Sequence, residues 1–151
     1  MTLYEEIPMD VTKLNEMAER VFLALVIWRE ARGESYVGKL AVAHSILNRV
    51  NRPSWWGNDL LSVLWKKWQY SSVTDPKDLQ LTRWPLASDP TWNSSLLAAC
   101  ETLDGISPNP VQGADSYYDI SIKPPYWATP ETLVRKIGKL VFHNLDHDPK
   151  P

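Results

Sequence analysis

Cysteine is nearly absent: the 151-residue sequence contains one thiol, Cys100. A single cysteine cannot close an intramolecular disulfide, so folding does not require an oxidising compartment. Metal-ligating residues are also scattered. His143 and His147 lie four positions apart, a spacing that can bind a metal, but no third ligand is near them. The chain lacks a phosphate-binding loop and a dinucleotide fingerprint, so we expect neither a metal nor another cofactor.

Neither charge nor hydropathy indicates a polyanion or a bilayer as partner. The 16 basic and 18 acidic residues give a net charge of −2, whereas nucleic-acid binders usually carry a basic excess. The longest apolar run, residues 21–28, is much shorter than the about 20 residues that span a bilayer. No basic and apolar leader opens the chain. We therefore expect synthesis in a cytoplasm, no nucleic-acid partner and no stable membrane insertion.

Glycine is scarce as well, with six residues against twelve prolines and eight tryptophans. Proline-rich loops are stiff, which suits a preorganised groove. Tryptophans pack in cores, and they also stack on sugar rings. The apolar fraction of 44% is sufficient for one hydrophobic core. Without a repeat or a linker, the chain is expected to form a single domain over residues 1–151, with residues 1–9 as a loose arm.

Hydrophobic spacing and capping residues predict five helices. The predicted ranges are 10–32, 37–50, 58–67, 90–104 and 130–145. The first helix is amphipathic at its start and apolar on all sides over residues 21–28, which predicts burial there. Residues 68–90 read as an irregular loop, and residues 116–118 as part of a loop or small hairpin. The expected fold is mainly α (α+β with a small β-hairpin), with about five helices around a buried central helix, the general plan of lysozyme-like folds.

Glu30 is the most informative residue, because it follows the apolar run at the end of the first predicted helix. Val26 and Ile27 lie one turn before it on the same side. Apolar neighbours and the helix C-terminus both raise a carboxyl pKa, whereas Arg29 and Arg32 would lower it if they came close. A protonated carboxyl near neutral pH is suited to general-acid catalysis.

Two alternatives stay open at this stage. Glu30 can instead be a solvated glutamate at a helix end, beside two arginines. Glycosidases often use a second carboxylate, and the loops offer four candidates that spacing does not distinguish: Asp75, Asp78, Asp115 and Asp119. A single glutamate without a carboxylate partner is instead a feature of lytic transglycosylases, in which the sugar's own C6 hydroxyl completes the reaction.

Two consecutive motifs carry a resemblance to a known family. The first is Glu30-Ala31-Arg32-Gly33-Glu34, and the second runs from Gly38 to Arg49, with the pattern G-x-x-A-V-A-x-x-I-L-N-R. Together they resemble the cell-wall hydrolase family that includes spore-cortex-lytic enzymes and phage and prophage endolysins. Weaker matches are Gln69-Tyr70-Ser71, where the family has Q-F-S, Gly113-Ala114 with Tyr117, and Pro124–Ala128, which is similar to phage members. Tyr70, Ser116 and Leu140 depart from the family's usual residues.

The resemblance implies an enzyme that cuts the β-1,4 bond between N-acetylmuramic acid and N-acetylglucosamine in peptidoglycan. It implies that Glu30 is the catalytic acid. The groove residues that it implies are Glu34, Gln69, Tyr70, Ser71, Gly113, Ala114, Tyr117 and Trp127. We expect a phage-type endolysin, made in a host cytoplasm and released to the cell wall, that is either a lytic transglycosylase or a muramidase and is a monomer. The alternative is a non-catalytic peptidoglycan-binding or assembly protein that reuses the same fold.

Overall fold

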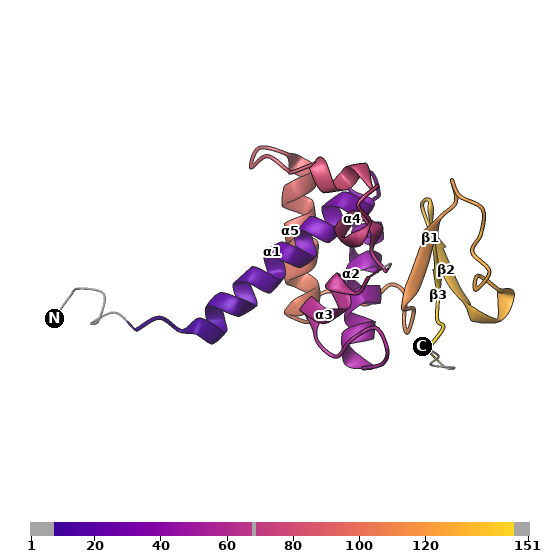
Figure 1. Cartoon of the computed structure of the whole chain (residues 1–151), viewed down its shortest axis with the longest axis horizontal. Coiled ribbons are helices and arrows are strands. Elements are labelled where there is room, and N and C mark those ends of the chain that lie inside the picture. Colours follow the sequence, from indigo (N-terminus) through magenta and orange to yellow (C-terminus); the bar gives the residue numbers. More distant parts are fainter. Residues whose placement is uncertain (1–7, 68, 147–151) are drawn as a thin grey trace.

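The computed structural model describes residues 8–67 and 69–146. Within these residues a body of α-helices stands beside a small antiparallel sheet (Figure 1). The α-helices are α1 (Val11–Ala31), α2 (Tyr36–Asn51), α3 (Leu60–Trp65), α4 (Ser71–Thr74) and α5 (Pro90–Leu103). The strands are β1 (Ser116–Asp119), β2 (Leu133–Ile137) and β3 (Leu140–His143), and η2 (Leu79–Thr82) and η3 (Pro130–Thr132) are 3-10 helices. This architecture confirms a mainly helical fold with a small β element.

Local capping explains where the helices begin. The Asp10 side chain accepts a hydrogen bond from the Lys13 backbone N–H, and Asp59 accepts one from Ser62. Asp89 does the same for Thr91 at the start of α5, where Pro90 occupies the first turn. Four of the predicted helices therefore form, with ends within about two residues of those expected from the sequence.

The C-terminal half of α1 is the centre of the core. Leu23, Ala24, Val26 and Ile27 have no solvent exposure, and α1 packs against α5 and α2. The N-terminal half is different: residues 11–18 are exposed and project from the helical body on the side away from the sheet (Figure 1). One helix thus joins a fully buried segment to a segment that no other described element covers.

The predicted helix over 130–145 is wrong. Pro130 starts only the short helix η3, after which the chain forms the hairpin β2–β3. Ile137 pairs with Leu140, so Gly138 and Lys139 form a two-residue turn, and Gly138 has a φ of +57°. A glycine at the first position of such a turn favours a hairpin over a continuous helix. Residues 140–143 are all buried in the structure, which a helix with one solvent face would not allow.

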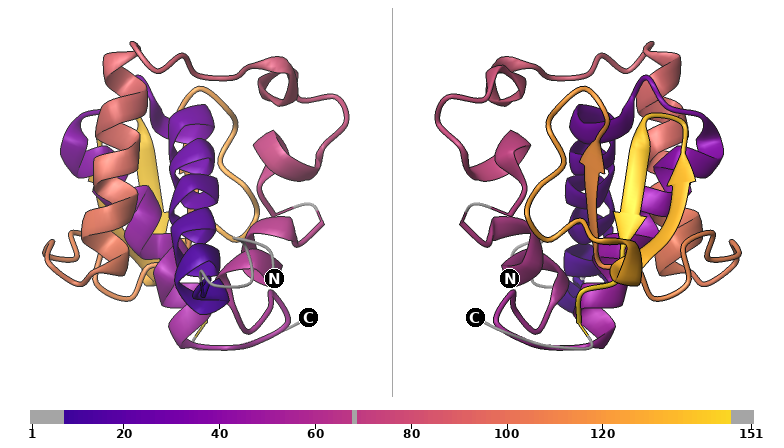
Figure 2. Two further views of the ribbon diagram at one scale, coloured as in Figure 1. Left: turned by 90° about the vertical axis from the view of Figure 1, so that its left-hand side faces the viewer. Right: turned by 90° about the vertical axis from the view of Figure 1, so that its right-hand side faces the viewer.

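β3 is the central strand of the sheet, which has the order β1–β3–β2 (Figure 2). Tyr117 of β1 pairs with Phe142 of β3, whose side chain is fully buried. This register presents β1 to the helical body and fixes the direction of the Tyr117 side chain. The sheet therefore places residues from the last third of the chain beside the end of α1.

Three smaller expectations have mixed outcomes. The segment predicted as an irregular loop over 68–90 contains α4 and η2, and Trp68 lies outside the described residues. Of the arm predicted over 1–9, only Pro8 and Met9 are described, and both are exposed and non-helical. No helix among residues 8–67 and 69–146 has the length and apolar character needed to cross a bilayer.

The glycine of the hairpin turn offers a test of the fold. A Cβ at Gly138 would lie 2.3 Å from Glu34 Oε1, in a backbone conformation that L-residues rarely adopt. We expect Gly138→Ala to lower the free energy of unfolding by about 1–3 kcal/mol, measured by urea denaturation. Gly33→Ala is the matched control, because a Cβ there meets nothing within 4 Å. Equal stability of the two variants would contradict this account of the turn.

Candidate active site

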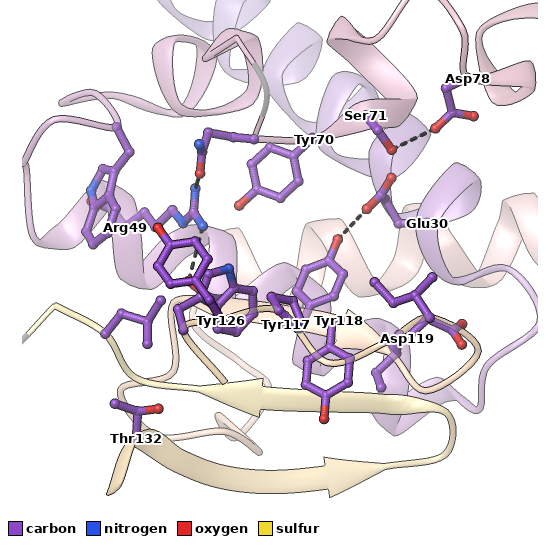
Figure 3. Close-up of a pocket in the computed structure, with 18 of the residues that line it drawn as sticks. Glu30, Arg49, Tyr70, Ser71, Asp78, Tyr117, Tyr118, Asp119, Tyr126 and Thr132 are labelled. Carbon is purple, nitrogen blue, oxygen red and sulfur yellow. Dashed lines mark hydrogen bonds between the residues drawn. The ribbon is translucent and has the colours of Figure 1, made fainter. Parts of the chain in front are cut away.

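A groove of about 1220 Å³ lies between the helical body and the sheet (Figure 3). Its walls come from the end of α1, from α2, from the segment 69–80 and from β1 with the loop that follows it. Seven aromatic side chains line it: Trp55, Trp56, Tyr70, Tyr117, Tyr118, Tyr126 and Trp127. Aromatic faces next to polar side chains suit a ligand with apolar ring faces and hydroxyl edges, such as a sugar chain.

Glu30 lies in the wall of this groove, in the last turn of α1, and its side chain is half-buried. Its Oε1 accepts a hydrogen bond from the Tyr117 hydroxyl at 2.6 Å (Figure 3). The two residues are 87 positions apart in the chain, so the sheet is required to bring them together. Glu30 is therefore not the solvated glutamate of the alternative interpretation.

Burial raises the pKa of Glu30 above its ordinary value. The hydrogen bond from Tyr117 and the nearby polar groups of Ser72 lower the pKa, and the negative charge of Asp78 raises it further. The loss of hydration is the largest of these effects, so the net shift is upward. No ion pair among the described residues includes Glu30. This arrangement favours a protonated carboxyl, as general-acid catalysis requires.

The neighbouring arginines do not neutralise Glu30, because both are bound elsewhere. Arg29 donates to the carbonyl oxygens of Ser72 and Arg83. Arg32 donates to the Gln80 side chain at 2.7 Å. Arg29 thus holds α4 against the end of α1, which places Ser72 beside the Glu30 carboxyl.

Arg49 of α2 ties together three parts of the groove wall. It donates to the Asp115 carbonyl at 2.6 Å and to Gln69 Oε1 at 3.0 Å. Its guanidinium also lies over the Trp56 ring at 5.1 Å and the Tyr70 ring at 5.3 Å. A single buried cation therefore fixes α2, the start of α4 and the beginning of β1 relative to one another.

The structure brings five of the predicted site residues besides Glu30 into the groove wall and leaves three outside it. The five are Gln69, Tyr70, Ser71, Tyr117 and Trp127. Glu34 Oε1 accepts the Lys139 backbone N–H at 3.0 Å, which braces the β2–β3 turn. The Gly113 carbonyl accepts from Arg52, and Ala114 is fully buried. These three residues shape the fold around the site and do not line it.

Of the four aspartates considered as a second catalytic carboxylate, two line the groove and two do not. Asp78 and Asp119 line the groove, whereas Asp75 and Asp115 do not. Asp115 is buried, accepts the backbone N–H groups of Leu145 and Asp146, and pairs with Arg52 at 3.5 Å. Its role is to anchor the chain after β3.

Sequence reasoning did not single out Ser72, Arg49 or Tyr126 as site residues. Ser72 directly follows the Q-Y-S segment and Arg49 ends the second motif, so both had a local signal. Tyr126, which is 96% exposed at the groove, stands in the segment Pro124–Ala128. The described residues contain no cluster of three or more acidic, histidine or cysteine side chains that could hold a metal. His147, the partner of His143 in the weak metal pattern, lies outside them.

The model of a family described as cell wall hydrolase matches residues 33–143. The match begins at Gly33, so it does not include Glu30. Spore cortex-lytic enzymes of Halalkalibacterium halodurans and Bacillus subtilis are 32% and 31% identical to the chain over 122 residues. These matches cover 81% and 80% of this chain but 33% and 35% of the relatives. The chain therefore spans about a third of the length of the curated relatives it matches.

Two solved structures are similar in fold. The catalytic domain of the germination-specific lytic transglycosylase SleB from Bacillus anthracis has a TM-score of 0.66 and 25% identity, over 83% of this chain and 93% of that domain. The catalytic domain of the Bacillus cereus SleB protein gives the same TM-score and identity, over 83% and 89%. The fold seen here is the fold of these domains.

The raised pKa of Glu30 predicts how stability depends on pH. A carboxyl with a higher pKa in the folded state binds more protons when folded than when unfolded. The free energy of unfolding therefore decreases as the pH rises. The decrease begins near the ordinary glutamate pKa of about 4.3 and continues until the pH has passed the raised pKa of Glu30. We expect the unfolding free energy of the wild type to fall in this window relative to Glu30→Gln, measured by denaturant titration at several pH values. A constant difference between the two proteins would contradict the shift.

The Tyr117 hydroxyl provides a second test. Because its hydrogen bond favours the ionised carboxylate, Tyr117→Phe should raise the pKa of Glu30 further. Carboxyl ¹³C NMR titration would measure this pKa directly. Tyr118→Phe is the matched control, since the described residues show no hydrogen bond from Tyr118 to Glu30. A pKa of Glu30 that stays the same in Tyr117→Phe would mean that the hydrogen bond does not act on the carboxyl in solution.

Proposed function

Because this chain belongs to the cell wall hydrolase family, we propose that it cleaves the β-1,4 bond between N-acetylmuramic acid and N-acetylglucosamine in peptidoglycan. The observation that carries the proposal is the Glu30 carboxyl, which is half-buried in the groove wall, has a raised pKa and accepts a hydrogen bond from Tyr117. The groove volume of about 1220 Å³ exceeds the roughly 300–1,000 Å³ typical of small-molecule pockets, which suits several linked sugars.

Glu30 acts first as an acid in this mechanism. Its proton passes to the glycosidic oxygen as the bond from that oxygen to C1 of N-acetylmuramic acid breaks, which leaves a positively charged ring and a carboxylate. Glu30 then takes the proton of the C6 hydroxyl of the same sugar, whose oxygen forms the new bond to C1. The product carries a 1,6-anhydro ring, no water is consumed, and Glu30 is protonated again.

The groove favours this single-acid route over one with two carboxylates. Asp78 accepts from the Ser71 hydroxyl at 2.7 Å and from the Gln80 backbone N–H at 2.8 Å. Asp119 accepts the Ser121 backbone N–H at 2.8 Å. Asp78 and Asp119 are thus bound to neighbouring groups of their own segments, and the third aspartate of the groove wall, Asp146, pairs with Arg52 at 3.3 Å. The lytic transglycosylase activity named for the Bacillus anthracis SleB domain supports the same choice.

The segment similar to phage members supports an endolysin-type role. Pro125, Tyr126 and Trp127 contribute to one wall of the groove, where a glycan strand would pass. We propose that the enzyme degrades peptidoglycan in the manner of a phage endolysin, made in a host cytoplasm and released to the wall. Muramidase action, with water in place of the C6 hydroxyl, is distinguished by its products.

Purified peptidoglycan is the direct test of the proposed reaction. The wild type should release soluble muropeptides with 1,6-anhydro ends, identified by liquid chromatography and mass spectrometry. Glu30→Gln keeps the shape of the side chain but carries no transferable proton, so the rate should fall by about 10²–10⁴-fold or more. Glu16→Gln, on the projecting half of α1, is the matched control and should keep the wild-type rate.

Each other result has a defined meaning. Reducing ends in place of anhydro ends would identify a muramidase. Unchanged turnover in Glu30→Gln would remove Glu30 from the catalytic role. Tight binding to peptidoglycan without released products would favour the non-catalytic alternative.

A further inference from the structure

The projecting half of α1 carries an apolar face that nothing covers in the described part of the chain. Val11, Leu14, Met17 and Val21 are between 49% and 60% exposed, although the same helix is fully buried from Leu23 onward. Figure 1 shows these first turns reaching away from the helical body. They precede the residues matched by the family model, so the groove does not account for them. A contiguous exposed apolar face of this kind marks an interaction site.

The spacing of this face fits another helix as partner. Its apolar residues follow one another at intervals of three and four over two heptads: Val11, Leu14, Ala18, Val21 and Leu25. This is the period of two helices that pack along a common seam. The exposed positions that flank the seam within the projecting turns hold Asn15 and Met17, neither of which is charged. Like charges therefore do not oppose a second copy of the same helix.

We propose that the projecting half of α1 pairs antiparallel with the same segment of a second copy of this chain. In this register Val11 of one copy lies against Val21 of the other, and Leu14 lies against Ala18. A large side chain then meets a small one at each central layer, which fills the seam evenly. The contact is symmetric, because each copy offers the same surface to the other, as in most homodimers.

The surface beside Val21 is complementary to the tip of the helix. A hollow of about 340 Å³ lies there, and its lining is mostly apolar: Val21, Leu25, Trp84, Pro85, Ala87 and Trp92. Met9, which is 68% exposed, extends beyond Val11 toward the hollow of the other copy in the antiparallel register. The apolar face of the helix and the rim of the hollow together match the smallest specific protein–protein interfaces, which bury about 1,200 Å² of surface in total. The dimer should therefore depend on protein concentration.

The charges of the segment disfavour a membrane as the occupant. Asp10, which caps the helix, together with Glu16 and Glu19 on its polar side outnumber Lys13 and Arg20. Helices that lie on bilayers are instead rich in lysine and arginine, because the lipid surface is anionic. The proposed dimer thus departs from the monomer that was expected from the sequence alone.

Dimerisation through this segment leaves both grooves accessible. Glu30 lies 12 residues beyond Ala18, which corresponds to about 18 Å along the helix. The sheet stands on the opposite side of the body from the projecting turns (Figure 1). A consequence, which rests on the proposed function, is that one particle carries two glycan-binding grooves and gains avidity for an insoluble wall.

Sedimentation velocity on the full chain tests the pairing. The wild-type mass should rise from one chain toward two with concentration, whereas Leu14→Glu should stay monomeric because it buries two charges in the seam. Leu14 is 54% exposed in the single chain, so this variant should fold, which circular dichroism would check. Glu16→Gln, on the outer face of the helix, should dimerise like the wild type.

Cysteine cross-linking tests the register. A mixture of Val11→Cys and Val21→Cys chains should form a mixed disulfide much faster than Val11→Cys alone, because antiparallel pairing puts position 11 beside position 21. A wild type that is monomeric at every concentration overturns the proposal, and so does a Leu14→Glu variant that still dimerises. Binding of the wild type, but not of Leu14→Glu, to anionic phosphatidylglycerol vesicles without self-association overturns it in favour of a membrane.

The outcome is separable from that of the proposed reaction. Leu14→Glu should cleave short soluble glycan fragments at the wild-type rate, but bind intact sacculi at least several-fold more weakly. Absence of products from the wild type would refute the proposed function and leave the dimer measurement unaffected.

Discussion

Removal of water from the Glu30 carboxyl is the constraint on which the site depends. α1 brings the carboxyl to the edge of the core, and the sheet closes over it from the other side through Tyr117. The cost of ionising a desolvated carboxyl raises its pKa, and one hydroxyl donor limits that rise without supplying a positive charge. The site is thus an acid held between two structural halves that are distant in the sequence.

The buried arginines show how this acid is kept from forming an ion pair. Arg29 and Arg49 donate mainly to carbonyl and amide oxygens of the backbone and of Gln69, so their charges hold segments in place. The guanidinium group of Arg29 also lies over the Trp84 ring, and that of Arg49 lies over the rings of Trp56 and Tyr70. A guanidinium beside Glu30 would have lowered its pKa, and the chain uses its nearest cations to build the wall of the groove instead.

The two halves of α1 differ in their surroundings, because its sequence is apolar on all sides in one half and amphipathic in the other. From Leu23 to Ala31 it is a core helix whose end carries the acid, and before Val21 it is an amphipathic helix that stands in solvent. A rigid helix that joins the two segments keeps the exposed apolar face at its start away from the groove at its end.

Local interactions were readable from the sequence, and contacts between distant segments were not. Caps such as Asp10, Asp59 and Asp89 act on backbone groups two or three residues away, so they placed four helices correctly. The motif around Glu30 drew attention to a carboxyl that the structure places in the groove wall. The hairpin at Gly138 was missed because its strands are stable only when paired with each other and with β1, a pairing that no local pattern encodes. Tertiary structure alone decided that Tyr117 meets Glu30, that Glu34 braces a turn, and that no other segment among residues 8–67 and 69–146 covers the start of α1, because each depends on which distant segment removes water from it.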